Sequence, residues 1–246
     1  LPCECEYSTA PITHTYATSG QYTITVSGTL TGFGQELVFE NPPVPLLGAE
    51  YLTAVTSFGD LGIESLSLAF FGSNNLIDVP AVLPATVTDL SGLFASASSF
   101  NDDISAWNTA NVTSMAFMFA DLIGLFSDST EPSSAFNQSL SSWVTSSVTD
   151  MSGMFYGATS FDQSLSSWNV SLVTNMRWML DNAALSTANY AATLIGWASR
   201  SVKPNVQFGA SGKSVGSYGS TGCSARQLLL DSPSSWIISD SSDCNI

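Results

Sequence analysis

Hydrophobic residues recur along the middle of the chain with a period of about 25 residues. Counted from an anchoring Val or Ile at position 0, apolar residues stand at positions 3, 6, 7, 13, 17 and 20. The clearest copy is VTDMSGMFYGATSFDQSLSSWNVS, residues 148–171, where the pattern falls on Val148, Met151, Met154, Phe155, Phe161, Leu165 and Trp168. The three- and four-residue spacings place the first four side chains on one face of a helix, and the last three form a second inward stripe.

Five such copies follow one another, and their anchors are Ile63, Val87, Val112, Val148 and Val173. The first copy is degenerate, and the third is lengthened by eleven residues after Phe126. No copy can bury its apolar faces alone, so the repeat predicts a solenoid in which equivalent residues of neighbouring coils stack. The Met and Trp stripes are interpreted as core ladders, with the indole N–H groups bonded to neighbouring loop carbonyls.

The two ends of the chain follow other patterns. Near the N-terminus, alternation of apolar and polar residues predicts a half-buried strand containing Tyr22, Ile24 and Val26. Near the C-terminus the period is lost, and we expect a helix at 225–230 and a strand at 236–238. The predicted organisation is a β-rich N-terminal segment (1–50), a repeat region (51–200) and a C-terminal cap (201–246).

Charge is distributed unevenly along the chain. All five Lys and Arg residues lie beyond residue 176, whereas residues 1–176 carry sixteen carboxylates, and the formal net charge is −15. Such a surface repels phosphate, which argues against nucleic acid and anionic membranes as partners. No apolar run reaches the roughly 18 residues of a membrane helix, so no membrane span is expected. Abundant Ser and Thr, few lysines and a start at Leu1, which indicates a processed or trimmed N-terminus, favour an extracellular or cell-surface location.

Three segments resemble a known family. VTDMSGMFYGATSFDQSLSSWNVS is similar to the repeat of about 26 residues in BspA-like leucine-rich-repeat surface proteins, known best from bacteria. ITHTYATSGQYTITVSG resembles the PKD-like strand region that precedes those repeats, and NYAATLIGWAS with ARQLLLDSPSSWIISD resembles their C-terminal close. The resemblance implies an α/β solenoid of leucine-rich-repeat-like coils, and a secreted or surface protein used in adhesion or as coat material, without enzymatic activity. The insert and the four cysteines at the chain ends depart from the family pattern.

Few residues suggest catalysis or metal binding. His14 is the only histidine, and a catalytic triad or a histidine metal site would need further ligands. Asp102 and Asp103 are adjacent in sequence and so diverge, although carboxylates from different coils could converge on a substrate. We therefore expect no catalytic residue and no cofactor, with Ca²⁺ held between coils as the alternative.

Covalent glycans are a second expectation from the sequence. Asn-X-Ser/Thr motifs occur at Asn111, Asn137 and Asn169. Asn111 and Asn169 follow the Trp of their copies, in a return loop expected to be exposed. These three residues are the candidate glycosylation sites.

The four cysteines are Cys3, Cys5, Cys223 and Cys244, an even number that predicts disulfides in a secreted chain. Three pairings stay open. Cys3 and Cys5 could join the C-terminal cap of the same chain, or the cap of a neighbouring copy in a head-to-tail polymer. Alternatively, Cys223 pairs with Cys244 within the cap.

Together these observations predict a non-enzymatic extracellular structural protein, a self-assembling subunit of a surface filament or coat. The alternative is a monomeric adhesin that binds glycans or other surface proteins through the exposed face of its coils.

Overall fold

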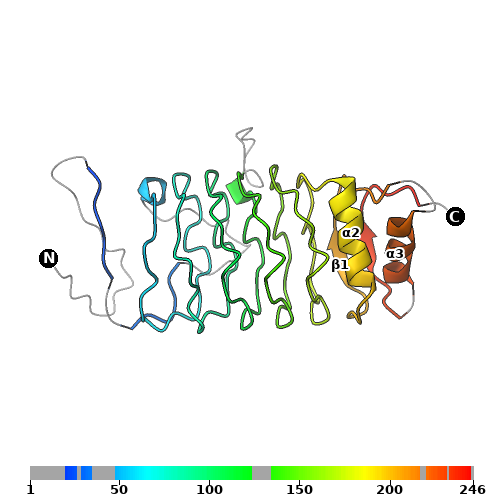
Figure 1. Ribbon diagram of the computed structural model, residues 1–246, viewed down its shortest axis with the longest axis horizontal. Helices are drawn as coiled ribbons and strands as arrows, with labels where there is room; N and C mark the ends of the chain where they lie inside the picture. Colours follow the sequence, from blue (N-terminus) through cyan, green and yellow to red (C-terminus); the bar gives the residue numbers. More distant parts are fainter. Residues whose placement is uncertain are drawn as a thin grey trace.

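The computed structural model describes residues 20–26, 29–34, 48–123, 134–216, 220–231 and 233–244. Figure 1 shows the successive copies of the repeat side by side along the long axis, with helices α2 and α3 at the C-terminal end. Parallel bridges join position 2 of each copy to the next, in the pairs Ser65–Asp89, Asp89–Ser114, Ser114–Asp150 and Asp150–Asn175. The chain therefore advances by one copy per bridge.

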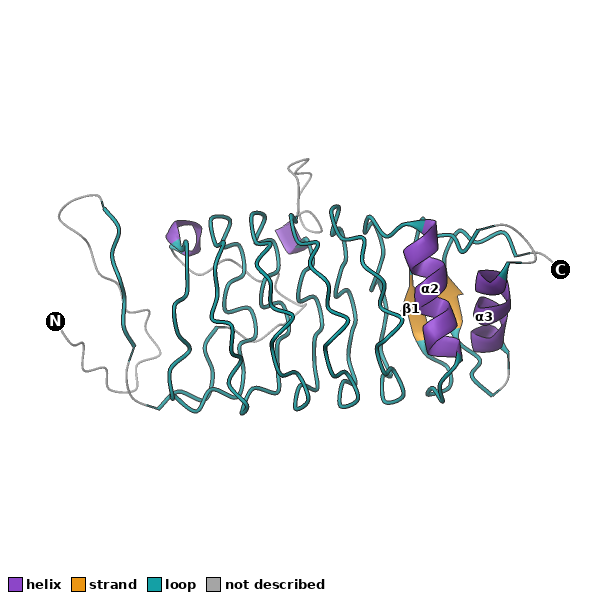
Figure 2. Cartoon of the chain, viewed as in Figure 1, coloured by secondary structure: helices purple, strands orange, loops and turns teal. Residues whose placement is uncertain are grey.

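The predicted α/β solenoid is wrong. Among the described residues, the α-helices of regular length are α2 (Thr187–Ala198) and α3 (Thr221–Leu230), and both follow the repeats. The strands are β1 (Gln207–Gly209) and β2 (Ile237–Ser239), which form one parallel pair, and a short 3₁₀ helix, η1, spans Ala49–Tyr51. Figure 2 shows that the copies consist mainly of loops and turns, apart from a short helical piece at Leu122 and Ile123.

Backbone conformation explains why the apolar spacing does not produce a helix. In four of the copies both position 5 and position 9 have positive φ, for example Gly153 at 56° and Gly157 at 67°. Left-handed residues interrupt an α-helix, so the hydrogen bonds divide into two sets. Met151, Gly153 and Phe155 donate their N–H groups to the next copy at 2.7–2.9 Å, whereas the N–H groups between them close tight turns.

The core nevertheless contains the predicted residues, stacked like on like. The seven apolar positions of residues 148–171 are fully buried. The rings of Phe94, Phe119 and Phe155 form a continuous stack with centroids 5.9 and 5.5 Å apart. The indole N–H of Trp168 donates to the carbonyl of Leu140 at 3.0 Å, which confirms the expected partner.

Near the N-terminus, the strand expected around Tyr22, Ile24 and Val26 is absent, whereas most of the predicted β-rich segment 1–50 lies outside the described residues. Residues 21–26 form no strand, and Tyr22, Ile24 and Val26 are 47, 75 and 53% exposed rather than half-buried. Alternation sets which side chains share a face, but a strand also needs a hydrogen-bonded neighbour, which alternation does not specify.

The C-terminal elements cover the last copy. The Ser186 hydroxyl accepts from the Asn189 N–H at the start of α2, and the Ser220 hydroxyl accepts from Cys223 N–H at the start of α3. Helix α2 buries Tyr190, Leu194 and Trp197, and β1 continues the row through a parallel bridge between Met176 and Phe208. The helix expected at 225–230 is confirmed as the second half of α3. The strand expected at 236–238 is confirmed within one residue as β2.

Candidate functional site

One side of the row is formed by the tight turns, and we call it the turn face. It comprises positions 5 and 8 of the five copies, which are Leu68, Gly92, Phe117, Gly153, Trp178 and Phe71, Ala95, Ala120, Tyr156, Asp181. In the first three copies its apolar side chains belong to a second buried cluster, separate from the main core, and Tyr156 packs against this cluster. The turn face is the part of the repeat where the copies differ most in side-chain size.

Large and small residues alternate at position 5 of the turn face. A Cβ atom on Gly92 would lie 2.4 Å from Cδ2 of Leu68, and one on Gly153 would lie 2.1 Å from Cε1 of Phe117. Each large side chain therefore lies over the glycine of the next copy. Both glycines also have positive φ, at 63° and 56°, a conformation that favours glycine.

At the last copy this fit ends and a hollow opens. Trp178 occupies position 5 and its side chain is 50% exposed, although φ there is 59°. Its ring centroid lies 6.4 Å from that of Phe117, which is buried beneath it. The hollow has a volume of about 370 Å³ and is lined by Phe117, Tyr156, Trp178, Asp181, Asn182 and Ser211.

Polar groups occupy the side of the hollow next to the cap. The backbone N–H of Ser211 donates to Oδ1 of Asp181 at 2.7 Å, which holds the carboxylate in place. Oδ2 of Asp181 has no hydrogen-bond partner within the described part of the chain. The Lys213 ammonium donates to the Ala183 carbonyl, and burial lowers the pKa of Lys213 while the charges of Asp181 and Asp162 oppose that shift. The hollow thus combines aromatic faces with a carboxylate, an amide and a hydroxyl.

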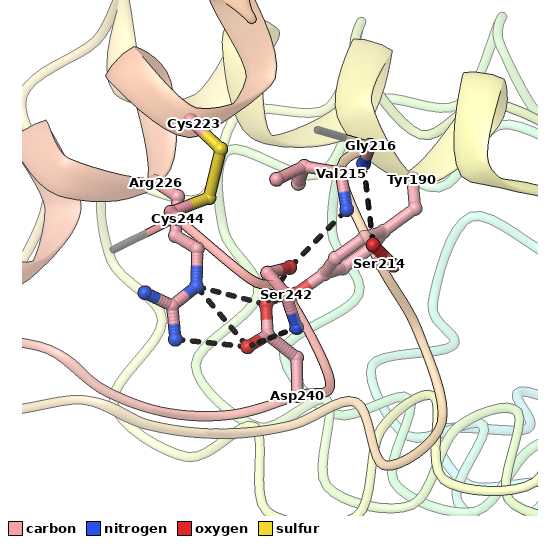
Figure 3. A network of polar contacts seen from close by, with 9 residues as sticks. All are labelled: Tyr190, Ser214, Val215, Gly216, Cys223, Arg226, Asp240, Ser242 and Cys244. Carbon is pink, nitrogen blue, oxygen red and sulfur yellow. Dashed lines mark hydrogen bonds and ion pairs between the residues drawn. A yellow bond between two sulfur atoms is a disulfide. The ribbon is translucent and has the colours of Figure 1, made fainter. Parts of the chain in front are cut away.

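A second polar cluster lies inside the cap (Figure 3). The Asp240 carboxylate is buried and accepts from Arg226 at 2.8–3.1 Å, from the Tyr190 hydroxyl at 2.7 Å and from the Ser242 hydroxyl at 2.8 Å. Burial would raise the pKa of Asp240, but these hydrogen bonds and the Arg226 charge lower it below its usual value. Burial, followed by the charge of Asp240, raises the pKa of Tyr190 well above its usual value. Because every group has a partner, the cluster joins α2, α3 and the segment after β2.

The disulfide lies beside this cluster. Cys223 of α3 is bonded to Cys244, with Cα atoms 5.5 Å apart (Figure 3). This is the local pairing among the three that the sequence left open. Cys3 and Cys5 lie outside the described residues. With Cys223 and Cys244 joined to each other, neither offers a thiol for a staple or a covalent head-to-tail link.

The three glycosylation candidates lie on different loops and none lines the hollow. Asn111 is exposed and its amide donates to the Ala85 carbonyl at 2.8 Å. Asn137 is exposed, and its side-chain oxygen accepts from the N–H of Asp162 at 2.9 Å. Asn169 is only partly exposed, and its side-chain oxygen accepts from the Ser171 N–H at 3.0 Å.

The remaining candidates form no reactive cluster. Asp102 accepts from the Val79 N–H and Asp103 from the Ser105 N–H, each at 3.0 Å, so the two carboxylates serve separate local contacts. Hydrogen bonds from Ser105 lower the pKa of Asp103. His14 lies outside the described residues, and so does part of the insert after Phe126. Among the residues that the structure does describe, no three His, Cys, Asp or Glu side chains gather closely enough to hold a metal ion. No described helix has the length and apolar character needed to span a bilayer.

Sequence reasoning did not single out the residues that line the hollow. Trp178 stands outside the repeated Trp position, and the other five tryptophans are at most 4% exposed. A partial signal was present in the sequence, because position 5 holds glycine in two other copies and position 8 holds alanine in two. Residues larger than glycine or alanine stand at Tyr156, Trp178 and Asp181, but Leu68, Phe71 and Phe117 are large as well, so size by itself does not mark the site.

Comparison with known protein families gives a match over most of the repeat region. Residues 64–193 match the family described as Mycoplasma protein of unknown function, DUF285. No curated protein and no solved structure matches the chain. The match covers the repeats and most of α2, and it includes every lining residue of the hollow except Ser211.

Proposed function

This chain belongs to the DUF285 family, and we propose that it is a non-enzymatic extracellular binding module that attaches to a surface ligand at the Trp178 hollow. The observation that carries the proposal is the exposure of Trp178, at 50%, on a scaffold whose other tryptophans are buried. A large aromatic side chain exposed beside polar groups is typical of binding sites.

Three further features support the proposal. The main core is filled by stacked apolar side chains, so a ligand would have to bind at the surface. The Cys223–Cys244 disulfide suits an oxidising compartment. The sequence resemblance to BspA-like surface proteins implies adhesion, which agrees with a binding role for the hollow.

The decisive variant is Trp178→Gly, because glycine occupies the same position in two other copies with the same backbone conformation. Labelled wild-type protein and the variant are applied to arrays of glycans and extracellular matrix proteins. Tyr51→Ala, which removes an aromatic side chain that is 80% exposed and far along the chain from the hollow, is the matched control. We expect saturable binding by wild type and Tyr51→Ala, and loss of binding by Trp178→Gly.

Sedimentation of the same samples separates this function from the filament subunit expected from sequence. A monomer that binds through Trp178 supports the proposal. Binding unaffected by Trp178→Gly, or polymers that form without any ligand and account for all surface attachment, would overturn it.

A further inference from the structure

We infer that the ligand group at the Trp178 hollow is an uncharged pyranose ring of a glycan. This inference rests on the proposed binding function and adds the chemical class of the ligand. Three properties of the described residues support it: aromatic surface, polar partners and charge.

The hollow presents an apolar surface next to hydrogen-bonding groups. Trp178 and Tyr156 provide aromatic surface, and Phe117 closes the base. Asp181, Asn182 and Ser211 provide a carboxylate, a carboxamide and a hydroxyl on the neighbouring side. A pyranose has C–H groups on its ring faces and hydroxyls around its edge, so it can contact both kinds of surface at once.

The carboxylate of Asp181 is positioned for this task. One of its oxygens is held by the Ser211 N–H at 2.7 Å, and Oδ2 has no partner in the described part of the chain. An ionised carboxylate accepts hydrogen bonds only, and it forms stronger ones than a neutral acceptor. A sugar hydroxyl can donate to Oδ2 without any rearrangement of Asp181.

Charge disfavours the acidic sugars. The lining contains one carboxylate and no cation, in a chain whose formal net charge is −15. The Lys213 ammonium interacts with the charge of Asp181, but it does not line the hollow and donates to the Ala183 carbonyl, and Arg177 donates to Gln207. A carboxylate or sulfate on the ligand would be repelled by Asp181 and by the net charge of the chain, so uronic acids, sialic acids and sulfated sugars should bind poorly.

The fluorescence of Trp178 tests the inference directly, because it is the one substantially exposed tryptophan of the six. The probes are methyl glycosides of glucose, galactose, mannose and N-acetylglucosamine, together with methyl glucuronide, which differs from the glucoside by its carboxylate. Acrylamide quenching is measured in the full chain with each probe, and affinities are measured by calorimetry. Trp178→Gly and Asp181→Ala test the two contacts, and alanine stands at the latter position in two other copies. Tyr51→Ala is again the control.

We expect at least one neutral glycoside to shield Trp178, with affinity lowered about tenfold or more by either hollow variant and unchanged in Tyr51→Ala. Methyl glucuronide should bind about tenfold more weakly than methyl glucoside. Equal or tighter binding of the glucuronide would overturn the inference. So would attachment to protein surfaces that depends on Trp178 while no sugar binds, and in that case the proposed function would survive. Absence of any attachment that depends on Trp178 would overturn both.

Discussion

The two ends of the turn face share one backbone and differ in a few side chains. In the first part, Leu68 lies over Gly92 and Phe117 over Gly153, so large and small residues fit and the surface is closed. In the last copy, Trp178 takes the same left-handed position, but its side chain is half exposed and borders a hollow. The same turn therefore provides either packing or a binding surface, and the neighbouring side chains decide which.

This difference indicates where a repeat protein can acquire function without losing its core. The main core repeats strictly because each residue packs on its counterpart in the next copy. The turn face is free of that restriction once the next element is no longer a repeat copy. At Trp178 the next element is β1 (Gln207–Gly209), which follows a helix and a different connection.

Removing the packed aromatic residue should have the largest effect. Phe117→Ala should lower the free energy of unfolding by about 3–5 kcal/mol, because Phe117 is 1% exposed and its loss leaves a cavity over Gly153. Urea denaturation followed by circular dichroism measures the change. The control is Phe33→Ala, at a side chain that is 39% exposed and should matter far less. Similar losses in both variants would show that Phe117 does not close the turn face.

Disrupting the cap should have the next largest effect on the free energy of unfolding. It should not affect the two ends of the turn face differently. Arg226→Met leaves the buried Asp240 carboxylate without its cation, which should cost about 3 kcal/mol at neutral pH. The variant should retain ligand affinity once folded, because Arg226 does not line the hollow. A large loss of ligand affinity in the folded variant would mean that the cap shapes the hollow at Trp178.

The pH dependence of the same pair follows from the lowered pKa of Asp240. A carboxylate with a lowered folded-state pKa contributes stability above its unfolded-state pKa of about 4, and that contribution is lost as the pH falls through the folded-state pKa. Wild-type stability should therefore decline in acid, and the gap between wild type and Arg226→Met should narrow there. A gap that stays constant from neutral pH to below about 3 would contradict this role.

Adding a side chain at a glycine in the closely packed part of the turn face should lower stability by an intermediate amount. Gly153→Ala places a Cβ atom 2.1 Å from the Phe117 ring and at a positive φ, so it should destabilise the fold by about 2 kcal/mol. Combining it with Phe117→Ala removes the clash, and the two effects should then be less than additive. Strictly additive losses in denaturant unfolding would show that the two residues do not interact.

The smallest effect on stability is expected for substitutions at the Trp178 hollow. Trp178→Gly relieves a left-handed backbone at a large residue and loses the partial packing of its ring, so stability should change by less than about 1 kcal/mol. Asn182→Gly, at φ 60° and exposed, should be equally mild. Thermal unfolding checks both. A loss of stability as large as that of Phe117→Ala would mean that Trp178 has a structural role. The last copy would then be packed in the same way as the earlier copies of the turn face.

The sequence alone determined which residues of the repeats form the main core. The periodicity identified the members of the main core and their stacking on equivalent residues. Local sequence patterns identified the helix and the strand near the C-terminus. A carbonyl acceptor for the indole N–H of Trp168 was expected, but not which carbonyl accepts it. Periodicity reports burial, because only apolar side chains recur where each copy meets the next. It does not report backbone conformation, and the spacing that suggested a helix belongs to turns with left-handed residues.

The tertiary structure alone decided the rest. The N–H groups of the turns bond to the next copy, so the backbone form depends on a neighbour about 25 residues away. The pairing of Cys223 with Cys244 depends on where α3 and the chain end come together. The hollow exists because Phe117, Tyr156 and Trp178 come from three different copies and Ser211 from the cap, a juxtaposition that no local pattern contains.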